Sequence, residues 1–258
     1  MATSRPARGI LHTLAGDTPT IWQVPEEVPA AILFNSVPYA VMMATPADLE
    51  DFATGFALAE GLVASPKYID GILVLPTEQG FAADLSIAPG KLIASRMVKR
   101  GMEGRAGCGL CGIEDIADAI RMPNGEVPRS PLPPAAVLRA YKALPGHQPM
   151  NALNRTVHAA AWCSVDGAIL QCREDVGRHN ALDKLIGALA RGETDFTSGF
   201  VLMSSRCSFE LVQKCALAGI GALATISAPT ARALQLARKA RLTLAALSRS
   251  GVMIFDED

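Results

Sequence analysis

Two cysteines, Cys108 and Cys111, stand three positions apart in the string RAGCGLCGIEDIADAI, with glycines around them. Two thiols at this spacing can supply half of a zinc site, form a redox-active dithiol, or hold sulfur as a persulfide. The spacing alone does not choose among these chemistries, so the rest of the chain has to discriminate.

A structural zinc site takes four ligands, usually as two close pairs. The other cysteines form no second close pair, because Cys163 and Cys172 are nine residues apart and Cys207 and Cys215 are eight apart. A redox dithiol of the thioredoxin type would follow a strand and open a helix. The preceding string KLIASRMVKRGMEGRAG is instead basic and interrupted by glycine, as in a loop. Zinc and dithiol redox chemistry are therefore disfavoured alternatives, and no structural metal is expected.

The basic loop favours a thiol that carries sulfur. The thiolate is the reactive form of cysteine, and its pKa falls near cations and helix N-termini. Four basic residues precede the pair, at Arg96, Lys99, Arg100 and Arg105, and a helix is expected to begin near Gly112. The glycines leave the backbone open to a partner and permit unusual φ values. Two cysteines in a tight glycine turn without any reactive role remain the structural alternative.

A second group of polar residues follows predicted strands in the C-terminal half. Four segments each come directly after an apolar run: EDVGRHN (174–180), SSRCSFE (204–210), SAPT (227–230) and SRSG (248–251). Ligands of open α/β sheets bind beyond the carboxyl ends of the strands, and the helix N-termini there attract anions. Arg178, Arg206 and Arg249 would bring three guanidinium groups to that edge, which suits a phosphate or pyrophosphate.

Each segment also has a purely structural interpretation. Helix capping accounts for the acidic, amide and hydroxyl side chains of two segments, Glu174, Asp175 and Asn180 in one, and Ser208 and Glu210 in the other. His179 and Asp183 are four residues apart and can hydrogen-bond across one helical turn.

The elements that must position these residues fall into two units. Residues 1–15 show no periodicity and are predicted to be a loose tail. Residues 16–122 form a smaller strand-rich unit, which includes a hairpin turn at Asn35-Ser36 and a helix with Thr45 as N-cap, and which ends in the CGLCG loop. Residues 123–134 are rich in proline and are predicted to be a linker.

Residues 135–258 are predicted to form an α/β domain, so that the chain is α+β overall. A connection near residues 135–155 leads into alternating strands and helices, with helices from His179, Phe209 and Thr230. Such alternation favours a sheet that includes parallel neighbours.

The composition limits the possible function classes. Of the 258 residues, 50% are hydrophobic and 19% charged, as in a globular protein, and the net charge of −1 argues against a general nucleic-acid binder. No apolar run reaches the roughly 20 residues that a membrane-spanning helix needs. The first residues lack the pattern of a signal peptide, so we expect a cytoplasmic protein whose thiols are kept reduced.

Several strings together identify a family. CGLCG, EDVGRHNALDK, SSRCSFELVQKCALAGI and SAPTARALQLA resemble the formate dehydrogenase accessory sulfurtransferase family, FdhD type, in a match running from about Val24 to Gly251. The resemblance implies a cytoplasmic homodimer that accepts persulfide sulfur from a cysteine desulfurase. It would deliver that sulfur to the molybdenum or tungsten bis-pterin guanine dinucleotide cofactor, before the cofactor enters the formate dehydrogenase catalytic subunit.

The resemblance also implies roles for particular residues. Cys108 would carry the persulfide and Cys111 would assist it. The family's cofactor-binding segment near the C-terminus matches six consecutive residues here: Leu247, Ser248, Arg249, Ser250, Gly251 and Val252. Further cofactor contacts are expected from Arg178, His179, Ser205 and Arg206. The C-terminal domain would be similar to the cytidine deaminase fold.

The chain departs from these patterns at three places. Arg155-Thr156 stands where the family usually has two glycines before the HAA string, and Ser205 replaces the glycine of an SGR string. His158 is followed by two alanines with no glutamate and no PCxxC downstream, so the zinc set of a cytidine deaminase is missing. A cofactor-binding insertion chaperone without sulfur chemistry is the alternative function.

Overall fold

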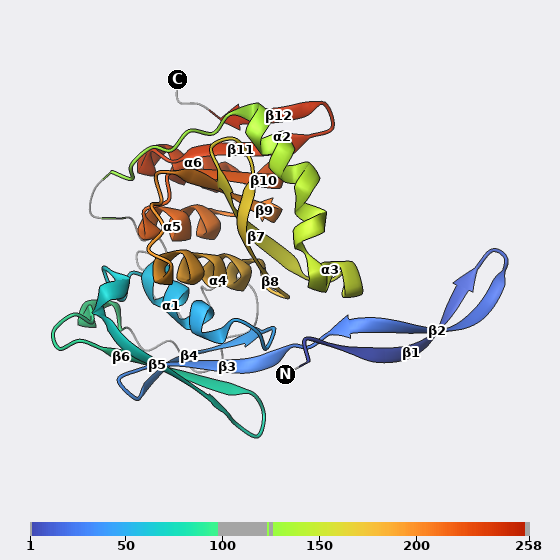
Figure 1. Cartoon of the computed structure of the whole chain (residues 1–258), viewed down its shortest axis with the longest axis horizontal. Helices are drawn as coiled ribbons and strands as arrows, with labels where there is room; N and C mark the ends of the chain where they lie inside the picture. The colour runs from blue at the N-terminus through green and yellow to red at the C-terminus, as the bar shows by residue number, and fades with distance from the viewer. Residues whose placement is uncertain (1, 98–122, 124–125, 256–258) are drawn as a thin grey trace.

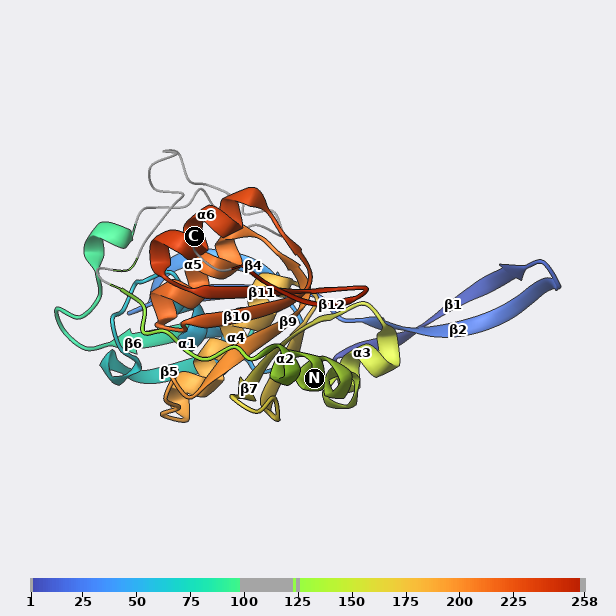
Figure 2. The same ribbon diagram turned by 90° about the horizontal axis from the view of Figure 1, so that it is seen from above.

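The computed structural model describes residues 2–97, 123 and 126–255, and within them it shows two sheets separated by helices (Figure 1). A four-stranded sheet belongs to the N-terminal part and a six-stranded mixed sheet to the C-terminal part. Helices α1 and α4 lie between these sheets, and the two N-terminal strands project away from both (Figures 1 and 2). The predicted combination of a strand-rich N-terminal part with a C-terminal α/β part is confirmed, whereas its specific likeness to cytidine deaminase stays a prediction.

The N-terminal strands and helix are β1 (Ser4–Thr13), β2 (Gly16–Pro25), β3 (Val28–Phe34), β4 (Val37–Ala44), α1 (Leu49–Ala59), β5 (Ile69–Pro76) and β6 (Phe81–Ile87). The C-terminal elements are α2 (Pro134–Ala143), α3 (Pro149–Asn154), β7 (His158–Ser164), β8 (Ile169–Asp175), α4 (Arg178–Arg191), β9 (Gly199–Cys207), α5 (Phe209–Ala218), β10 (Ala222–Pro229), α6 (Ala231–Ala240), β11 (Thr243–Ser248) and β12 (Gly251–Phe255).

The predicted hairpin turn at Asn35-Ser36 is confirmed. Both residues have positive φ, 49° and 63°, as the two central residues of a type I′ turn require. This turn joins β3 to β4, and β3 also pairs in parallel with β6.

The prediction for the start of α1 is wrong by one turn. The helix begins at Leu49, and its N-cap Asp48 is left-handed with φ 52°. Thr45 does not cap it, because its polar groups are engaged elsewhere. Its backbone N–H donates to Asp175 Oδ2 at 2.9 Å, and its hydroxyl accepts from the backbone N–H of Val176 at 3.1 Å.

The C-terminal sheet has the strand order β12-β11-β10-β9-β7-β8. Strands β9, β10 and β11 are parallel, which confirms the predicted parallel neighbours, while β7 runs antiparallel to both β8 and β9. Helices α4, α5 and α6 bury their apolar residues against one face of this sheet. Helix α2 packs on the opposite face with a separate apolar cluster.

The expectation of a loose N-terminal tail is wrong. Residues 4–13 are not loose, because β1 pairs with β2 through ten residue pairs. Its apolar residues fall on both faces of the ribbon, so no alternation marked it as a strand. The connection expected near residues 135–155 contains two helices, at 134–143 and 149–154. The predicted domain boundaries remain predictions, although one core continues from Phe34 and Phe52 to Leu182 and Val212.

The N-terminal and C-terminal parts meet where α1 crosses α4. A Cβ on Gly55 would lie 1.7 Å from the carbonyl oxygen of Asp183, and one on Gly187 would lie 1.9 Å from that of Asp51. Real side-chain carbons do not approach carbonyl oxygens this closely, so the helices can cross at this distance only because both residues are glycine. The crossing fixes α4, and with it the sheet edge where α4 begins.

Candidate functional site

The four polar segments that follow β8, β9, β10 and β11 lie along one edge of the C-terminal sheet. Because β7 is antiparallel to both β8 and β9, strand β8 has the same direction as β9 and its parallel neighbours. The carboxyl ends of all four strands therefore meet at a single edge, as the sequence predicted. The first residue of β7, His158, pairs with Asp175 at that same edge.

Buried polar atoms without partners concentrate at this edge. Within the described residues, Arg178 Nε, His179 Nε2, Ser208 Oγ and Glu210 Oε2 are buried and have no hydrogen-bond partner. The first two begin α4 and the other two begin α5. The two remaining atoms of this kind, on Trp162 and Gln171, lie within β7 and β8. Buried polar groups are normally satisfied, so this edge has the character of a ligand site.

His179 and Glu210 face one another across the edge. Nε2 of His179 lies 3.9 Å from Oε2 of Glu210, which is close enough for an ion pair and too far for a hydrogen bond. Burial lowers the pKa of His179, although Glu210 acts in the opposite direction. Burial alone would raise the pKa of Glu210, but His179, Ser208 and its own backbone N–H outweigh it and lower the pKa to about 2.

His158 belongs to the same group, although the sequence offered no specific signal for it. Burial, followed by the nearby positive charge of Arg178 and the proximity of His179, lowers its pKa. The buried part of the edge thus presents the Arg178 guanidinium, the Glu210 carboxylate and the imidazoles of His158 and His179. The two imidazoles are mostly neutral at pH 7. Such a mixture of donors and acceptors can bind a ligand that carries phosphates together with a hydrogen-bonding base.

The other two predicted arginines at this edge are more exposed. Arg206 is exposed near the end of β9, and Ser205 is buried beside it, with its hydroxyl donating to the Arg206 carbonyl oxygen at 3.0 Å. Arg249 is exposed in the tight turn that joins β11 to β12.

The C-terminal segment 247–252 forms that hairpin. The Ser248 hydroxyl donates to the Gly251 carbonyl oxygen at 3.1 Å and accepts from the backbone N–H of Ser250 at 3.3 Å. Gly251 has φ 153°, a region that other residues rarely adopt. Leu247 and Val252 pair across the hairpin and pack against the α2-side cluster. These two residues hold the turn to the sheet.

Several residues of the EDVGRHN segment have structural partners. Glu174 accepts hydrogen bonds from the backbone N–H groups of Met150 and Asn151 at the start of α3. Asp175 Oδ1 accepts from the Gly177 backbone and from the Asn180 side chain. These residues therefore have structural partners, but the expected capping of α4 is not observed, because its N-cap is Gly177, with no side-chain cap hydrogen bond.

The proposed hydrogen bond between His179 and Asp183 is wrong. Both carboxylate oxygens of Asp183 accept from Lys214 Nζ at 2.9 Å, so this carboxylate is directed to α5. The capping expected of Ser208 is also not observed, since its side chain makes no N-cap hydrogen bond.

The backbone conformation of Arg155 explains why the family usually has glycine at this position. It ends α3 in the left-handed conformation with φ 56°. Glycine is the common residue at such helix ends because it has no Cβ to strain that conformation. Backbone conformation therefore accounts for a glycine at this position.

The thiols of the described residues are unsuited to reaction. Burial raises the pKa of Cys163 and of Cys207 to about 12, and it also raises that of Cys215. Cys108 and Cys111 lie outside the described residues. In the part that the structure describes, no group of three or more His, Cys, Asp or Glu side chains is placed to hold a metal ion.

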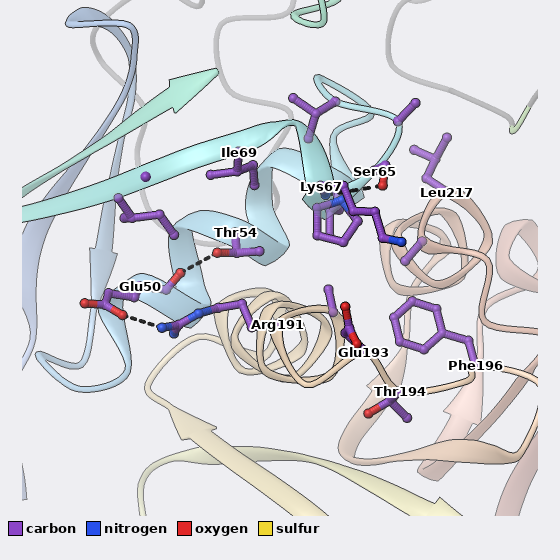
Figure 3. A pocket seen from close by; sticks show the side chains of 18 residues that line it. Glu50, Thr54, Ser65, Lys67, Ile69, Arg191, Glu193, Thr194, Phe196 and Leu217 are labelled. Carbon is purple, nitrogen blue, oxygen red and sulfur yellow. Dashed lines mark hydrogen bonds and ion pairs between the residues drawn. The ribbon is translucent and has the colours of Figure 1, made fainter. Parts of the chain in front are cut away.

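A cavity of about 830 Å³ lies at the opposite edge of the sheet, beside the C-terminal ends of α4 and α5 (Figure 3). Arg191 and Glu193 line it from the end of α4, Leu217 from α5, and Lys67 and Ile69 from the N-terminal part. None of the predicted site residues that the structure describes lines this cavity. The cavity is therefore distinct from the candidate site at the carboxyl ends of β8, β9, β10 and β11, which we call the strand-end site.

Comparison with known proteins identifies the family of this chain. The chain matches the FdhD/NarQ family over residues 25–255. The chain belongs to the FdhD/NarQ family. Two FdhD/NarQ relatives are described as sulfur carrier protein FdhD. The one from Bordetella petrii is 45% identical, with 88% of this chain and 82% of the relative covered. The one from Chromobacterium violaceum is 47% identical, with 93% and 90% covered.

A solved structure supports the fold of this FdhD/NarQ chain. A candidate formate dehydrogenase accessory protein from Desulfotalea psychrophila superposes with a TM-score of 0.78 at 23% identity, covering 99% of this chain and 98% of that one. Its similarity concerns the fold alone. No helix among the described residues has the length and apolar character needed to cross a membrane.

Proposed function

We propose that this chain is a sulfur carrier protein and an accessory protein for formate dehydrogenase. It would accept persulfide sulfur from a cysteine desulfurase and act as a sulfurtransferase toward a molybdenum or tungsten bis(pterin guanine dinucleotide) cofactor. The observation that carries the proposal is identity of 45 to 47% to sulfur carrier proteins across about nine-tenths of the chain. The CGLCG string supports it with the thiols that such a reaction needs.

Sulfur uptake is a thiolate exchange at Cys108. The Cys108 thiolate attacks the terminal sulfur of the donor's persulfide, a new S–S bond forms on Cys108, and the donor cysteine leaves as a thiolate. Arg96, Lys99, Arg100 and Arg105 lie close in sequence and would favour the thiolate. No net oxidation occurs in this step, so it needs no external oxidant.

Sulfur release requires two electrons, which Cys111 can supply. Attack of the Cys111 thiolate on the inner sulfur of the Cys108 persulfide forms a Cys108–Cys111 disulfide and releases the outer sulfur as hydrosulfide. The two cysteine sulfurs are oxidised while the released sulfur is reduced. A cellular thiol would then reduce the disulfide and restore the carrier.

The strand-end site suits the guanine dinucleotide part of the cargo. Arg178, Arg206 and Arg249 can bind its phosphates, and Ser205 and the 247–252 hairpin lie along the same edge. His179, with Nε2 buried and unpartnered, can donate to a phosphate from Nε2–H of the neutral imidazole, whereas the unpartnered Glu210 Oε2 can accept from the N–H groups of guanine. The edge therefore fits a ligand that carries both groups.

The location, oligomeric state and partners of the protein are proposed from the family resemblance. We propose a cytoplasmic homodimer that meets two proteins in turn, a cysteine desulfurase as donor and the formate dehydrogenase catalytic subunit as recipient. No nucleic acid or membrane is required for this role.

The test is to load the purified protein with sulfur from a cysteine desulfurase and to map its peptides by mass. The peptide with Cys108 should gain about 32 Da, roughly one sulfur atom. Cys108→Ala should lose this gain, whereas Cys172→Ala, which removes a half-buried thiol with a pKa raised to about 12 by burial, should retain it. An unchanged gain on another residue of Cys108→Ala would contradict the assignment.

A binding-only insertion chaperone is the second candidate, because the strand-end site stands independently of the thiols. Restoration of formate dehydrogenase activity in cells by a Cys108→Ala/Cys111→Ala double variant would favour it. Binding is tested separately with GDP as the probe. Arg178→Gln should weaken GDP binding about tenfold or more, as expected for a lost charged hydrogen bond, whereas Arg139→Gln, at an exposed arginine paired with Asp166, should not.

A further inference from the structure

Helices α4 and α5 both begin at the strand-end site and pack against each other on one face of the sheet (Figure 1). Each helix carries two ionisable residues four positions apart, His179 and Asp183 on α4, and Glu210 and Lys214 on α5. Residues at this spacing share one helix face and lie about 6 Å apart along the axis. The helix contact therefore holds an outer pair at the site, His179 with Glu210, and an inner pair one turn behind it, Asp183 with Lys214.

The inner pair is closed and buried. Lys214 Nζ donates to both carboxylate oxygens of Asp183 at 2.9 Å, and it lies 3.3 Å from Glu60 Oε1 at the end of α1. The side chains of Lys214, Asp183 and Glu60 are all less than a tenth exposed. Apolar side chains of similar volume often stabilise a protein core as well as a buried ion pair does. Stability by itself therefore does not account for this charged cluster.

The outer pair is open. His179 Nε2 and Glu210 Oε2 are 3.9 Å apart, and neither atom has a hydrogen-bond partner. A carboxylate four residues further along a helix is the expected partner of a histidine, and Asp183 stands at that position. Both oxygens of Asp183 are instead occupied by Lys214. The lysine thus takes the acid that would otherwise bind the imidazole.

We propose that Lys214 is a positioning residue of the strand-end site: by holding Asp183, it keeps His179 free to bind the guanine dinucleotide. This inference rests on the proposed binding of that ligand at this edge. Without the lysine, Asp183 would be a buried carboxylate in need of a donor, and His179, one turn away on the same helix, would donate to it. An imidazole engaged in this way no longer donates to the ligand.

The charges around His179 act in the same direction. They come from three elements: Arg178 and Asp183 on α4, Glu210 and Lys214 on α5, and His158 on β7. Burial chiefly lowers the pKa of His179, against the opposing effect of Glu210. The positive charges of Arg178 and Lys214 lower that pKa further. Loss of the lysine charge therefore favours an imidazolium paired with Asp183.

The affinity of the full-length protein for GDP at pH 7 tests the proposal. Lys214→Met should weaken GDP binding about tenfold, as for the loss of one hydrogen bond to the ligand, whereas Lys214→Arg, which keeps a cation for Asp183, should stay within about threefold of the parent. The double variant Lys214→Met/Asp183→Leu also removes the competing carboxylate, so its affinity should return to within about threefold of the parent.

A matched control separates this effect from a general loss of stability. Ile32→Ala removes a fully buried side chain from the four-stranded sheet, away from the strand-end site. It should lower the midpoint of thermal unfolding and leave the affinity of the folded protein for GDP unchanged.

The NMR signal of the His179 ring provides a second readout that needs no ligand. The signal is assigned by its loss in His179→Gln. In the parent it should titrate below pH 6.5, because the pKa is lowered. In Lys214→Met it should titrate at a higher pH than in the parent, and in the double variant the titration should move back down. A lysine with a purely structural role would not produce this pattern.

Three results would overturn the proposal: parent-like GDP binding by Lys214→Met, a double variant that binds as weakly as the single one, or a His179 titration that Lys214→Met leaves unchanged. If circular dichroism shows that Lys214→Met does not fold, the double variant decides, and binding about tenfold weaker than the parent's by the folded double variant overturns the proposal. A parent that does not bind GDP contradicts the proposed nucleotide site, whereas the titration of His179 still decides whether Lys214 controls the imidazole.

Discussion

Lys184 Nζ lies 2.7 Å from Asp175 Oδ2, and both side chains are completely buried. The same lysine donates to the Thr45 carbonyl oxygen at 3.0 Å, and the same carboxylate accepts from the Thr45 backbone N–H. Two residues of the string EDVGRHNALDK thus bind the N-terminal part to the C-terminal sheet. The neighbouring Arg178 and His179 of that string keep buried atoms free at the sheet edge. One short segment therefore both joins the two parts and supplies the candidate site.

Replacing Lys184 with methionine should destabilise the protein strongly. The variant leaves Asp175 charged and buried without its cation, and breaking a buried pair in this way costs about 3–5 kcal/mol. Urea unfolding should show this loss. Lys142→Met, at an exposed lysine on α2, is the control and should change the free energy of unfolding by about 0.5 kcal/mol or less. A stability equal to that of the parent would mean that Asp175 is protonated or solvated.

The helix crossing predicts a second loss of stability. Gly55→Ala and Gly187→Ala each place a methyl group within 2 Å of a carbonyl oxygen, so α1 and α4 must separate. We expect a loss of at least 1–3 kcal/mol from overpacking, seen as a lower midpoint of thermal unfolding. Gly71→Ala is the matched control, because its Cβ would meet nothing within 4 Å. Equal midpoints for Gly55→Ala and Gly71→Ala would contradict the proposed closeness of the crossing.

Local patterns predicted most strands and helices of the C-terminal sheet and the single edge at which its polar segments meet. They failed where long-range partners decide the outcome. The sequence around Thr45 is typical of an N-cap, but in the structure Thr45 hydrogen-bonds to Asp175 and Val176, about 130 residues away. The N-terminal ribbon of β1 and β2 was not predicted from the sequence. Its apolar residues lie on both faces and the chain covers neither face, so the sequence lacks the alternation that indicates a strand.

The residues of the candidate site also include some that the sequence predicted and some that it missed. Arg178 was predicted from its position after a strand and His179 from the family resemblance, and the structure leaves both with unpartnered atoms. Glu210 was assigned to capping, since its place in the first turn of α5 gives no sign that its carboxylate faces His179. His158 lacked any signal, because its approach to Arg178 depends on the pairing of β7 with β8.

The described cysteines should resist alkylation in the folded state. Burial raises the pKa of Cys163, Cys172 and Cys207 to about 12, so at pH 8 their reactive thiolate is nearly absent. Brief treatment with iodoacetamide at pH 8, followed by peptide mapping, should label these three positions at less than about a tenth of the level reached in urea. Labelling of Cys207 in the folded protein at its urea level would show that β9 opens readily.

The histidines at the sheet edge should make stability fall at mildly acidic pH. The pKa of His179 is lowered below 6.5 in the folded protein, chiefly by burial, so below pH 6.5 the unfolded state binds more protons than the folded state. Stability from this group is present above pH 6.5 and is lost as the pH falls through the folded pKa, by at most about 1.4 kcal/mol per pH unit for one proton. His179→Gln should remove this part of the slope, in urea unfolding compared at pH 7.5 and pH 5.5. His147→Gln, at an exposed histidine, controls for loss of an imidazole and should keep the parent's slope. If His179→Gln loses as much stability between the two pH values as the parent, His179 is protonated in the folded protein and the neutral imidazole assigned to the site is wrong.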